Sequence, residues 1–253
     1  MQIVLGPTRA PRRSKATWLI AGILVGLSLV VAGIWCVAFL PSYLAYYRYQ
    51  PQEGDVVFQS LPYSRLVTAI EGATRSPFSH CGIVAKQDGR WVVYEAFKPV
   101  GPTPLGEFIG RGRNGAFAVY RFRAPHQQHI PQVLANVREY RGRPYDERYR
   151  LDDDAAAIYC SELIYLAYQD AAGEQLGKLV TLGELKWQPY TELIERIENG
   201  PPPLDRKIIT PRDLASAPQL EKVYSFRFKE PRTERATQSR AQLAVWAAGL
   251  GLH

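Results

Sequence analysis

The chain has 253 residues, of which 46% are hydrophobic and 22% are charged, a composition typical of a folded protein with one sizeable core. Its net charge of +7 is concentrated at the start, because Arg9, Arg12, Arg13 and Lys15 precede every acidic residue. The rest of the chain has no stripe of basic residues interleaved with stacking aromatics, so we expect no nucleic-acid partner.

The first expected element is a transmembrane helix over residues 17–40. This run contains no charged residue, and about 20 apolar residues are enough for a helix to cross a bilayer. The four basic residues precede it, and a tyrosine-rich segment follows. The positive-inside rule therefore predicts a cytoplasmic tail at residues 1–16, contact with the membrane lipid bilayer through residues 17–40, and an extracytoplasmic location, periplasmic or at the outer surface, for the remainder.

Beyond a linker over residues 41–53, we expect one folded domain over residues 54–230 and a C-terminal tail over residues 231–253. The domain alternates short β-branched runs with amphipathic stretches, which favours an α+β fold. Glycines and prolines over residues 101–115 indicate a flexible loop. The other expected elements are strands at 54–59, 116–122 and 222–228, helices at 62–73, 131–140, 158–171 and 189–197, and a hairpin that turns at residues 87–90.

The hairpin register brings two titratable side chains together. If residues 87–90 form a two-residue turn with its flanking pair, His80 and Glu95 are diagonal neighbours on one face of the hairpin. Gly82 lies opposite Glu95 and leaves room for the carboxylate to reach the imidazole. Cys81 points to the other face, where we expect it to be a small buried side chain away from the site.

Cys160 comes at the start of an expected helix, where unpaired N–H groups and the helix dipole favour a thiolate. With His80 as base and Glu95 as orienting carboxylate, it completes a nucleophilic site. Tyr145 and Asp146 are candidates for shaping the substrate-binding pocket. Each of these residues alone is more often structural than catalytic, so the hypothesis rests on the ordered set.

A metal site is not expected. His126 and His129 have a spacing that metals use, but no third ligand lies near them in the sequence. We therefore expect neither a metal nor any other cofactor.

Six motifs in order resemble those of the YiiX-like (YiiX/YebB-like) cysteine hydrolases, the circularly permuted branch of the NlpC-type papain-like peptidases. The resemblance implies a circularly permuted papain-like α+β catalytic domain over residues 54–230, with His80, Glu95 and Cys160 as catalytic residues. Cys81 departs from the family pattern, in which an aliphatic residue usually follows the histidine. The motifs are GDVVFQ at 54–59, SHCGIV at 79–84, VYEA at 93–96, GRPYD at 142–146, YCSEL at 159–163 and TPRDL at 210–214.

Three functions are compatible with these observations. The first is a membrane-anchored cysteine hydrolase that cleaves an amide bond in cell-wall peptides. The second is a lipid-directed thiol hydrolase or acyltransferase that resembles the lecithin:retinol acyltransferase group, with a lipid acyl substrate. The third is a binding module that keeps the fold without catalysis, and it predicts a Cys160 thiol of ordinary reactivity.

Overall fold

The computed structural model describes residues 15–151 and 155–228. Residues 1–14 of the expected cytoplasmic tail and the expected C-terminal tail at 231–253 lie outside this range. The chain divides into two compact units, Met1–Pro41 and Ser42–His253. We describe each unit by itself.

Helix α1, Lys15–Arg48, contains the segment predicted to span a membrane. The large apolar side chains that the structure describes between Trp18 and Val37 are exposed. Judged by length and hydropathy, none of the described helices qualifies as a membrane span.

The expected linker at residues 41–53 begins as the last part of α1 and is anchored to the second unit. Ala45 and Tyr49 are buried. The Tyr49 hydroxyl donates to Asp55 over 2.6 Å. Arg121 donates two further hydrogen bonds to the same carboxylate, over 2.7 and 2.9 Å. Because Asp55 is fully buried, these three bonds offset the cost of burying its charge.

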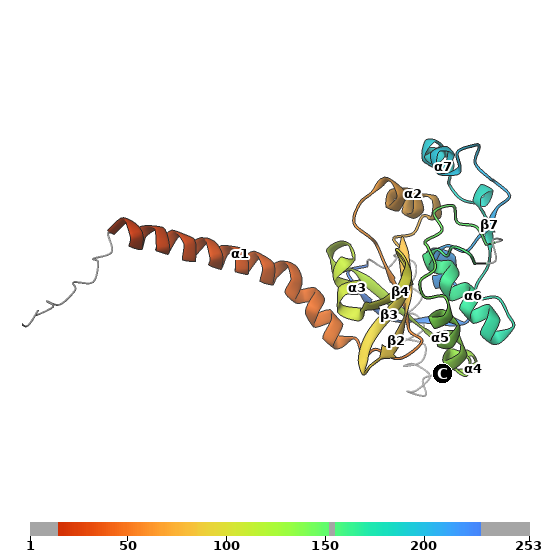
Figure 1. Cartoon of the computed structure of the whole chain (residues 1–253), viewed down its shortest axis with the longest axis horizontal. Helices are drawn as coiled ribbons and strands as arrows, with labels where there is room; N and C mark the ends of the chain where they lie inside the picture. Colours follow the sequence, from red (N-terminus) through yellow and green to blue (C-terminus); the bar gives the residue numbers. More distant parts are fainter. Residues whose placement is uncertain (1–14, 152–154, 229–253) are drawn as a thin grey trace, which may run out of the picture. The chain divides into compact units, whose positions relative to one another are not determined.

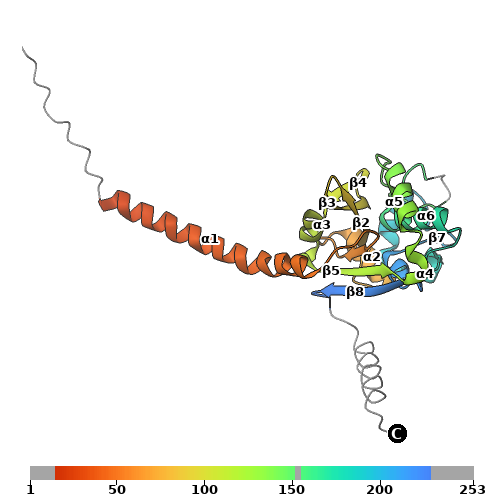
Figure 2. The same cartoon turned by 90° about the horizontal axis from the view of Figure 1, so that it is seen from below.

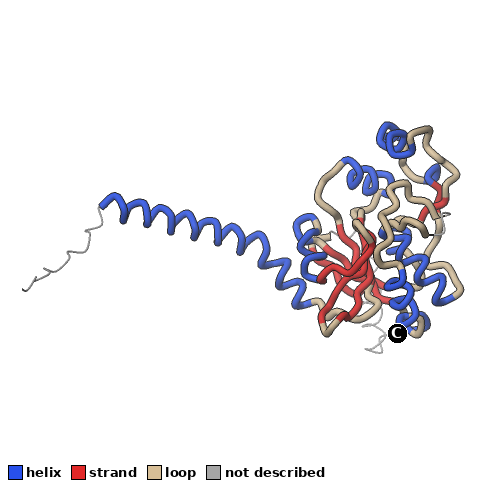
Figure 3. The backbone as a smooth tube through the Cα atoms, viewed as in Figure 1, coloured by secondary structure: helices blue, strands red, loops and turns tan. Residues whose placement is uncertain are grey.

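The second unit is built on a six-stranded antiparallel sheet, drawn in red in Figure 3. Its strand order is β4-β3-β2-β1-β5-β8, and a separate two-stranded sheet pairs β6 with β7. The central strands are rich in the β-branched and aromatic residues that fit a pleated surface. The bounds are β1 Val56–Gln59, β2 His80–Gln87, β3 Arg90–Ala96, β4 Val100–Pro104, β5 Phe117–Phe122, β6 Val180–Thr181, β7 Lys207–Ile208 and β8 Leu220–Phe226.

Helices cover the two faces of the large sheet unequally. Helices α5 and α6 pack on one face, and α3 lies on the other (Figures 1 and 2). Successive side chains of each strand point to opposite faces of the sheet, so Cys81 and Ile83 pack on the α6 side and Val84 and Val93 pack on the α3 side. The remaining bounds are α2 Arg65–Thr74, α3 Leu105–Arg111, α4 Ala124–Gln127, α5 Ile130–Glu139, α6 Cys160–Ala172, α7 Thr191–Glu198 and α8 Pro211–Ala215.

The flexible loop predicted at residues 101–115 is ordered instead, which corrects the sequence interpretation. It forms the edge strand β4, helix α3 and a short 3₁₀ helix. Prolines 102 and 104 are tolerated because β4 has a partner on one side only. Leu105, Phe108 and Ile109 are buried, and their packing holds α3 on the sheet.

Helix α2 begins three residues later than its apolar pattern predicts. The Ser64 hydroxyl accepts a hydrogen bond from the Val67 N–H over 3.1 Å and so caps the helix, which begins at Arg65. The other predicted strands and helices are present, with ends shifted by a few residues.

Candidate active site

The hairpin that carries the expected base has the predicted register. Gln87 pairs with Arg90 around a two-residue turn, in which both turn residues have positive φ. His80 and Glu95 lie on one face, with 2.5 Å between the imidazole Nε2 and the carboxylate Oε2. A Cβ added at Gly82 would lie 2.3 Å from a Val93 methyl carbon and 3.3 Å from the Glu95 Cβ, so the glycine allows the close approach of Val93, and its predicted role beside the carboxylate stays a prediction.

Glu95 is almost fully buried and has two further partners that the sequence reasoning missed. Arg111 on α3 donates to the same Oε2 that meets His80. Thr103 on β4 donates to Oε1 over 2.5 Å. Burial opposes the carboxylate charge, but the hydrogen bonds from His80, Arg111 and Thr103 outweigh it and lower the pKa of Glu95 to about 2. Glu95 is therefore ionised at neutral pH.

Cys160 is the first residue of α6 and is 3% exposed. The imidazole of His80, whose Nε2 contacts Glu95, interacts with this thiol. A hydrogen bond from Cys81 and the interaction with His80, working against burial, lower the pKa of Cys160 well below its usual value. Burial also opposes the imidazolium, but the bonds to Cys160 and Glu95 raise the pKa of His80 to about 9. A thiolate–imidazolium pair at neutral pH follows.

The prediction that Cys81 lies away from the site is wrong. Cys81 is fully buried and points to the face opposite His80 and Glu95, as the register requires. That face is the one that α6 covers, so the Cys81 thiol reaches Cys160. Burial, together with the charge on Cys160, raises the pKa of Cys81 well above its usual value. Cys81 therefore stays a protonated donor beside the thiolate.

Tyr145 and Asp146 occupy the loop that leads toward α6. The buried Asp146 carboxylate accepts the backbone N–H of Arg148 over 2.8 Å, which fixes the loop. The Tyr145 hydroxyl lies 3.5 Å from that of Tyr149, and burial raises the pKa of Tyr145. Neither residue lines the cavity beside Cys160, so their predicted role in substrate binding stays a prediction.

A cavity of about 130 Å³ opens beside Cys160. Its charged lining is Arg148, Glu198 and Arg206, of which Glu198 and Arg206 neutralise each other through two hydrogen bonds of 2.6 and 2.9 Å. The wall is otherwise largely aliphatic, so it offers few partners to a charged ligand. The aliphatic residues from α2 and α7 are Leu66, Ile70, Leu193, Ile194 and Ile197.

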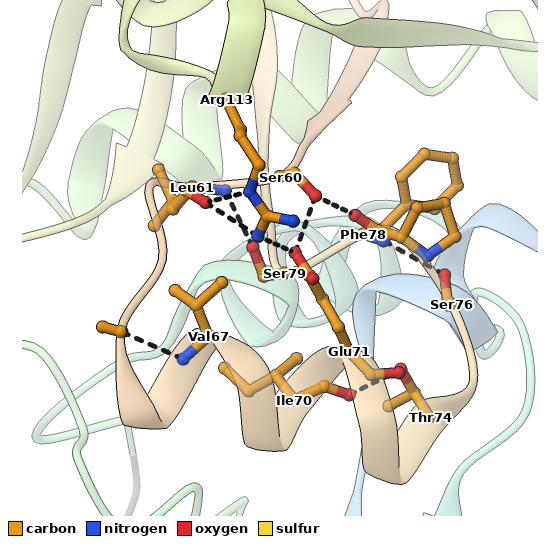
Figure 4. Close-up of polar contacts among 12 residues, drawn as sticks. Ser60, Leu61, Val67, Ile70, Glu71, Thr74, Ser76, Phe78, Ser79 and Arg113 are labelled. Carbon is orange, nitrogen blue, oxygen red and sulfur yellow. Dashed lines mark hydrogen bonds and ion pairs between the residues drawn. The ribbon is translucent and has the colours of Figure 1, made fainter. Parts of the chain in front are cut away.

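A polar network holds the segment just before the expected base (Figure 4). Arg113 binds the Glu71 carboxylate over 2.7 Å and the Leu61 carbonyl over 3.0 Å. The Ser60 hydroxyl donates to the same carboxylate over 2.6 Å, and the Ser79 hydroxyl accepts from the Leu61 N–H over 2.9 Å. These bonds join α2 to the residue preceding the strand β2, so the start of that strand is fixed in place.

The fold and the site together define a papain-like hydrolase in permuted order. The sheet is antiparallel, the cysteine starts the helix packed on it, and the histidine and the carboxylate come from earlier strands. The chain belongs to the permuted papain-like amidase family, described as "Permuted papain-like amidase enzyme, YaeF/YiiX, C92 family", which matches residues 50–224. This confirms the resemblance inferred from the motifs, and the permuted papain-like α+β fold. The protein is accordingly a cysteine hydrolase of the amidase type.

Two relatives illustrate the match. The uncharacterized protein YiiX of Escherichia coli (strain K12) is 34% identical over 181 residues, which cover 70% of this chain and 88% of that protein. The crystal structure of metalloprotein yiiX from Escherichia coli O157:H7 is similar with a TM-score of 0.61 and 30% identity, covering 70% of this chain and 99% of that one.

The relative of known crystal structure is described as a metalloprotein. Within residues 15–151 and 155–228 of this chain, no three His, Cys, Asp or Glu side chains are grouped so as to hold a metal ion. We therefore derive no step through a metal.

Proposed function

We propose that Cys160, His80 and Glu95 are the catalytic residues of an amidase. The observation that carries this proposal is the buried imidazole of His80, whose Nε2 lies 2.5 Å from the Glu95 carboxylate and which interacts with the Cys160 thiol. That is the arrangement a thiol nucleophile needs: a base within hydrogen-bond reach and a third group that orients the base.

The reaction has two steps. The Cys160 thiolate attacks the amide carbonyl carbon, while backbone N–H groups at the start of α6 stabilise the oxyanion. The C–N bond breaks as imidazolium His80 gives its proton to the leaving nitrogen. Water then attacks the thioester on Cys160 and passes a proton to His80, which releases the carboxylic acid and restores the thiolate.

The cavity favours a substrate with an aliphatic chain, such as an N-acyl amide or a lipid ester, over a cell-wall peptide. The aliphatic wall between α2 and α7 is continuous with Cys160. A stem peptide from the cell wall carries several charges, and apart from a carboxylate that meets Arg148, they would lose hydration against this wall without gaining a partner. The lipid-directed function therefore becomes the leading candidate for the substrate, and the cell-wall peptide is the alternative.

This choice is tested by incubating the wild-type protein and Cys160→Ala with each of three substrates. They are a long-chain N-acyl amide, a phospholipid ester and a muropeptide. We expect product from the first or second substrate with wild type only. Ile194→Glu should raise KM for a long-chain amide and leave a short-chain amide unaffected, whereas Val223→Glu, on the distant strand β8, should change neither. Release from the muropeptide alone would reverse the choice, and release from none of them would refute both candidates.

The membrane anchor is a second part of the proposal. Residues 17–40 carry no charge, and basic residues precede them, so the proposed topology places the N-terminus in the cytoplasm and the catalytic domain outside it. None of the described helices is long and apolar enough to count as a membrane span, so the helices give this part no support. Extraction of membranes with alkaline carbonate decides it. Retention of the full chain, with the domain open to protease from the outer side, is expected, and release into the supernatant would refute the anchor.

A further inference from the structure

The Glu95 carboxylate, 1% exposed, is shared by two cations. Its Oε2 meets both the His80 Nε2, at 2.5 Å, and the Arg111 Nη2. Its Oε1 accepts the Thr103 hydroxyl at 2.5 Å. In the proposed orienting carboxylate, Oε2 is thus shared between the base and Arg111, and Oε1 binds Thr103 instead of the base.

Arg111 is held against the same aromatic rings that hold the base. Its guanidinium carbon lies 4.1 Å from the centre of the Phe97 ring and 5.5 Å from that of Phe108. The ring of His80 lies 5.8 and 5.7 Å from the same two rings. Phe108 is fully buried on α3, so the packing of that helix places Arg111 and confines His80 together.

The charged groups around Glu95 come from each element packed against it. They are His80 from β2, Arg111 from α3 and, beyond the imidazole, Cys160 from α6. Thr103 from β4 adds a neutral donor. Glu107 precedes Arg111 by one helical turn and is exposed, so water screens its charge.

Two cations on one carboxylate oxygen have opposite effects on the two titratable groups. The guanidinium stabilises the carboxylate anion and keeps it available to the imidazole. The same positive charge disfavours a second cation nearby, so it weakens the hold of His80 on its proton. A general acid that must give up its proton in every turnover benefits from this weakening.

We infer that Arg111 and Thr103 are positioning residues, which act on the reaction through Glu95. Thr103 fixes one carboxylate oxygen, and Arg111 shares the other with His80, so that the imidazolium is oriented without being held too strongly to donate its proton. This inference rests on the proposed function, because it assigns roles relative to His80 as acid and base.

The test measures the protonation of His80 directly, without a substrate. The chain has 4 histidines, so NMR of histidine-labelled protein follows each imidazole against pH in a Cys160→Ala background. In Arg111→Met we expect the His80 midpoint to move upward by about one pH unit or more, because the competing cation is gone. Arg111→Lys keeps the charge and should stay close to the parent. The signals of His126 and His129, which pack beside Tyr168, report whether each variant is folded.

Thr103 has a matched pair of variants. Thr103→Val leaves Oε1 buried without its donor and should lower kcat/KM by about tenfold or more, while Thr103→Ser should restore it. In the Cys160-containing enzyme, Arg111→Met should move the alkaline limb of kcat/KM to higher pH.

An unchanged His80 midpoint in folded Arg111→Met would overturn the inference, and so would a shift to lower pH. A raised KM with an unchanged midpoint would also overturn it and make Arg111 a substrate-binding residue. The NMR result stands even if no tested substrate is cleaved, so a failure of the proposed function is distinguishable from a failure of this inference.

Discussion

Replacing Cys81 tests the correction that the structure makes at the nucleophile. The Cys81 thiol is fully buried, and its hydrogen bond is the largest influence that lowers the pKa of Cys160. A hydrogen bond to a charged group contributes about 1.5–3 kcal/mol, and a thiol is a weak donor, so we take the lower end. Since about 1.4 kcal/mol corresponds to a factor of ten, Cys81→Ala should shift the thiol–thiolate equilibrium of Cys160 by about tenfold toward the thiol. Cys81→Ser keeps a donor and should shift it much less.

The assay is the rate of alkylation of Cys160 by iodoacetamide as a function of pH, with the labelled site mapped by mass spectrometry. A Cys36→Ser background removes the exposed third thiol. In Cys81→Ala the reactivity midpoint should move to higher pH, and the rate on the acidic side should fall by about tenfold. An unchanged midpoint in a folded variant would refute the role of Cys81 as donor. A midpoint no lower than that of an ordinary thiol in the parent protein would instead favour the binding-module hypothesis.

Three further predictions concern stability, measured by urea unfolding. Glu95→Gln should lower the free energy of unfolding by about 3–5 kcal/mol near pH 6, because it leaves buried cations without their anion. The pKa of Glu95 is about 2 in the folded protein and 4.5 in the unfolded chain, so its contribution to stability is present above pH 4.5 and is lost as the pH falls toward 2. The pKa of His80 is about 9 in the folded protein and 6.5 in the unfolded chain, so its own contribution is present below pH 6.5 and is lost as the pH rises through 9. The lowered pKa of Cys160 acts with the opposite sign to that of His80, because it adds stability as the pH rises toward the ordinary thiol value, so the wild-type profile tests the Glu95 shift: no loss of stability as the pH falls from 4.5 toward 2 would contradict it. Gly82→Ala should cost about 1–3 kcal/mol, because its Cβ would lie 2.3 Å from a Val93 methyl carbon, and a cost near zero would show that the hairpin gives way easily. Gln59→Met should stabilise by about 1 kcal/mol, since the buried amide of Gln59 has no partner among the described residues, and a loss instead would reveal a bound partner for that amide.

The hairpin shows what a sequence pattern determines well. A two-residue turn has few geometries, and side chains alternate strictly along a strand, so the pairing of His80 with Glu95 followed from the position of the turn alone. The same arithmetic placed Cys81 correctly on the opposite face. It contained no information about which face α6 would cover, because that depends on packing between segments about 80 residues apart. The error over Cys81 arose at that step.

The missed partners of Glu95 have a different cause. Thr103 stands between two prolines, and Arg111 stands among glycines, so the segment was interpreted as a flexible loop. At a sheet edge, however, prolines cost no ladder bond, and the apolar residues of α3 are sufficient to dock a two-turn helix. Once β4 is recognised as a strand, its register pairs Thr103 with Val93, which places the hydroxyl on the face of Glu95. Alternation would then have predicted that contact.

The charges of the buried site alternate in sign from one residue to the next. This alternation explains how several ionisable groups can be buried together. Arg111, Glu95, His80 and Cys160 alternate in sign, and the neutral Cys81 ends the series. Each charge has an opposite neighbour, so the desolvation of one is offset by the next. In the proposed reaction, the charge of the attacking thiolate moves to the oxyanion, and the sum of the charges does not change. Only the transfer of the His80 proton to the leaving nitrogen neutralises both members of the pair. In the proposed mechanism, the carboxylate that Arg111 and His80 share orients the donor of this proton.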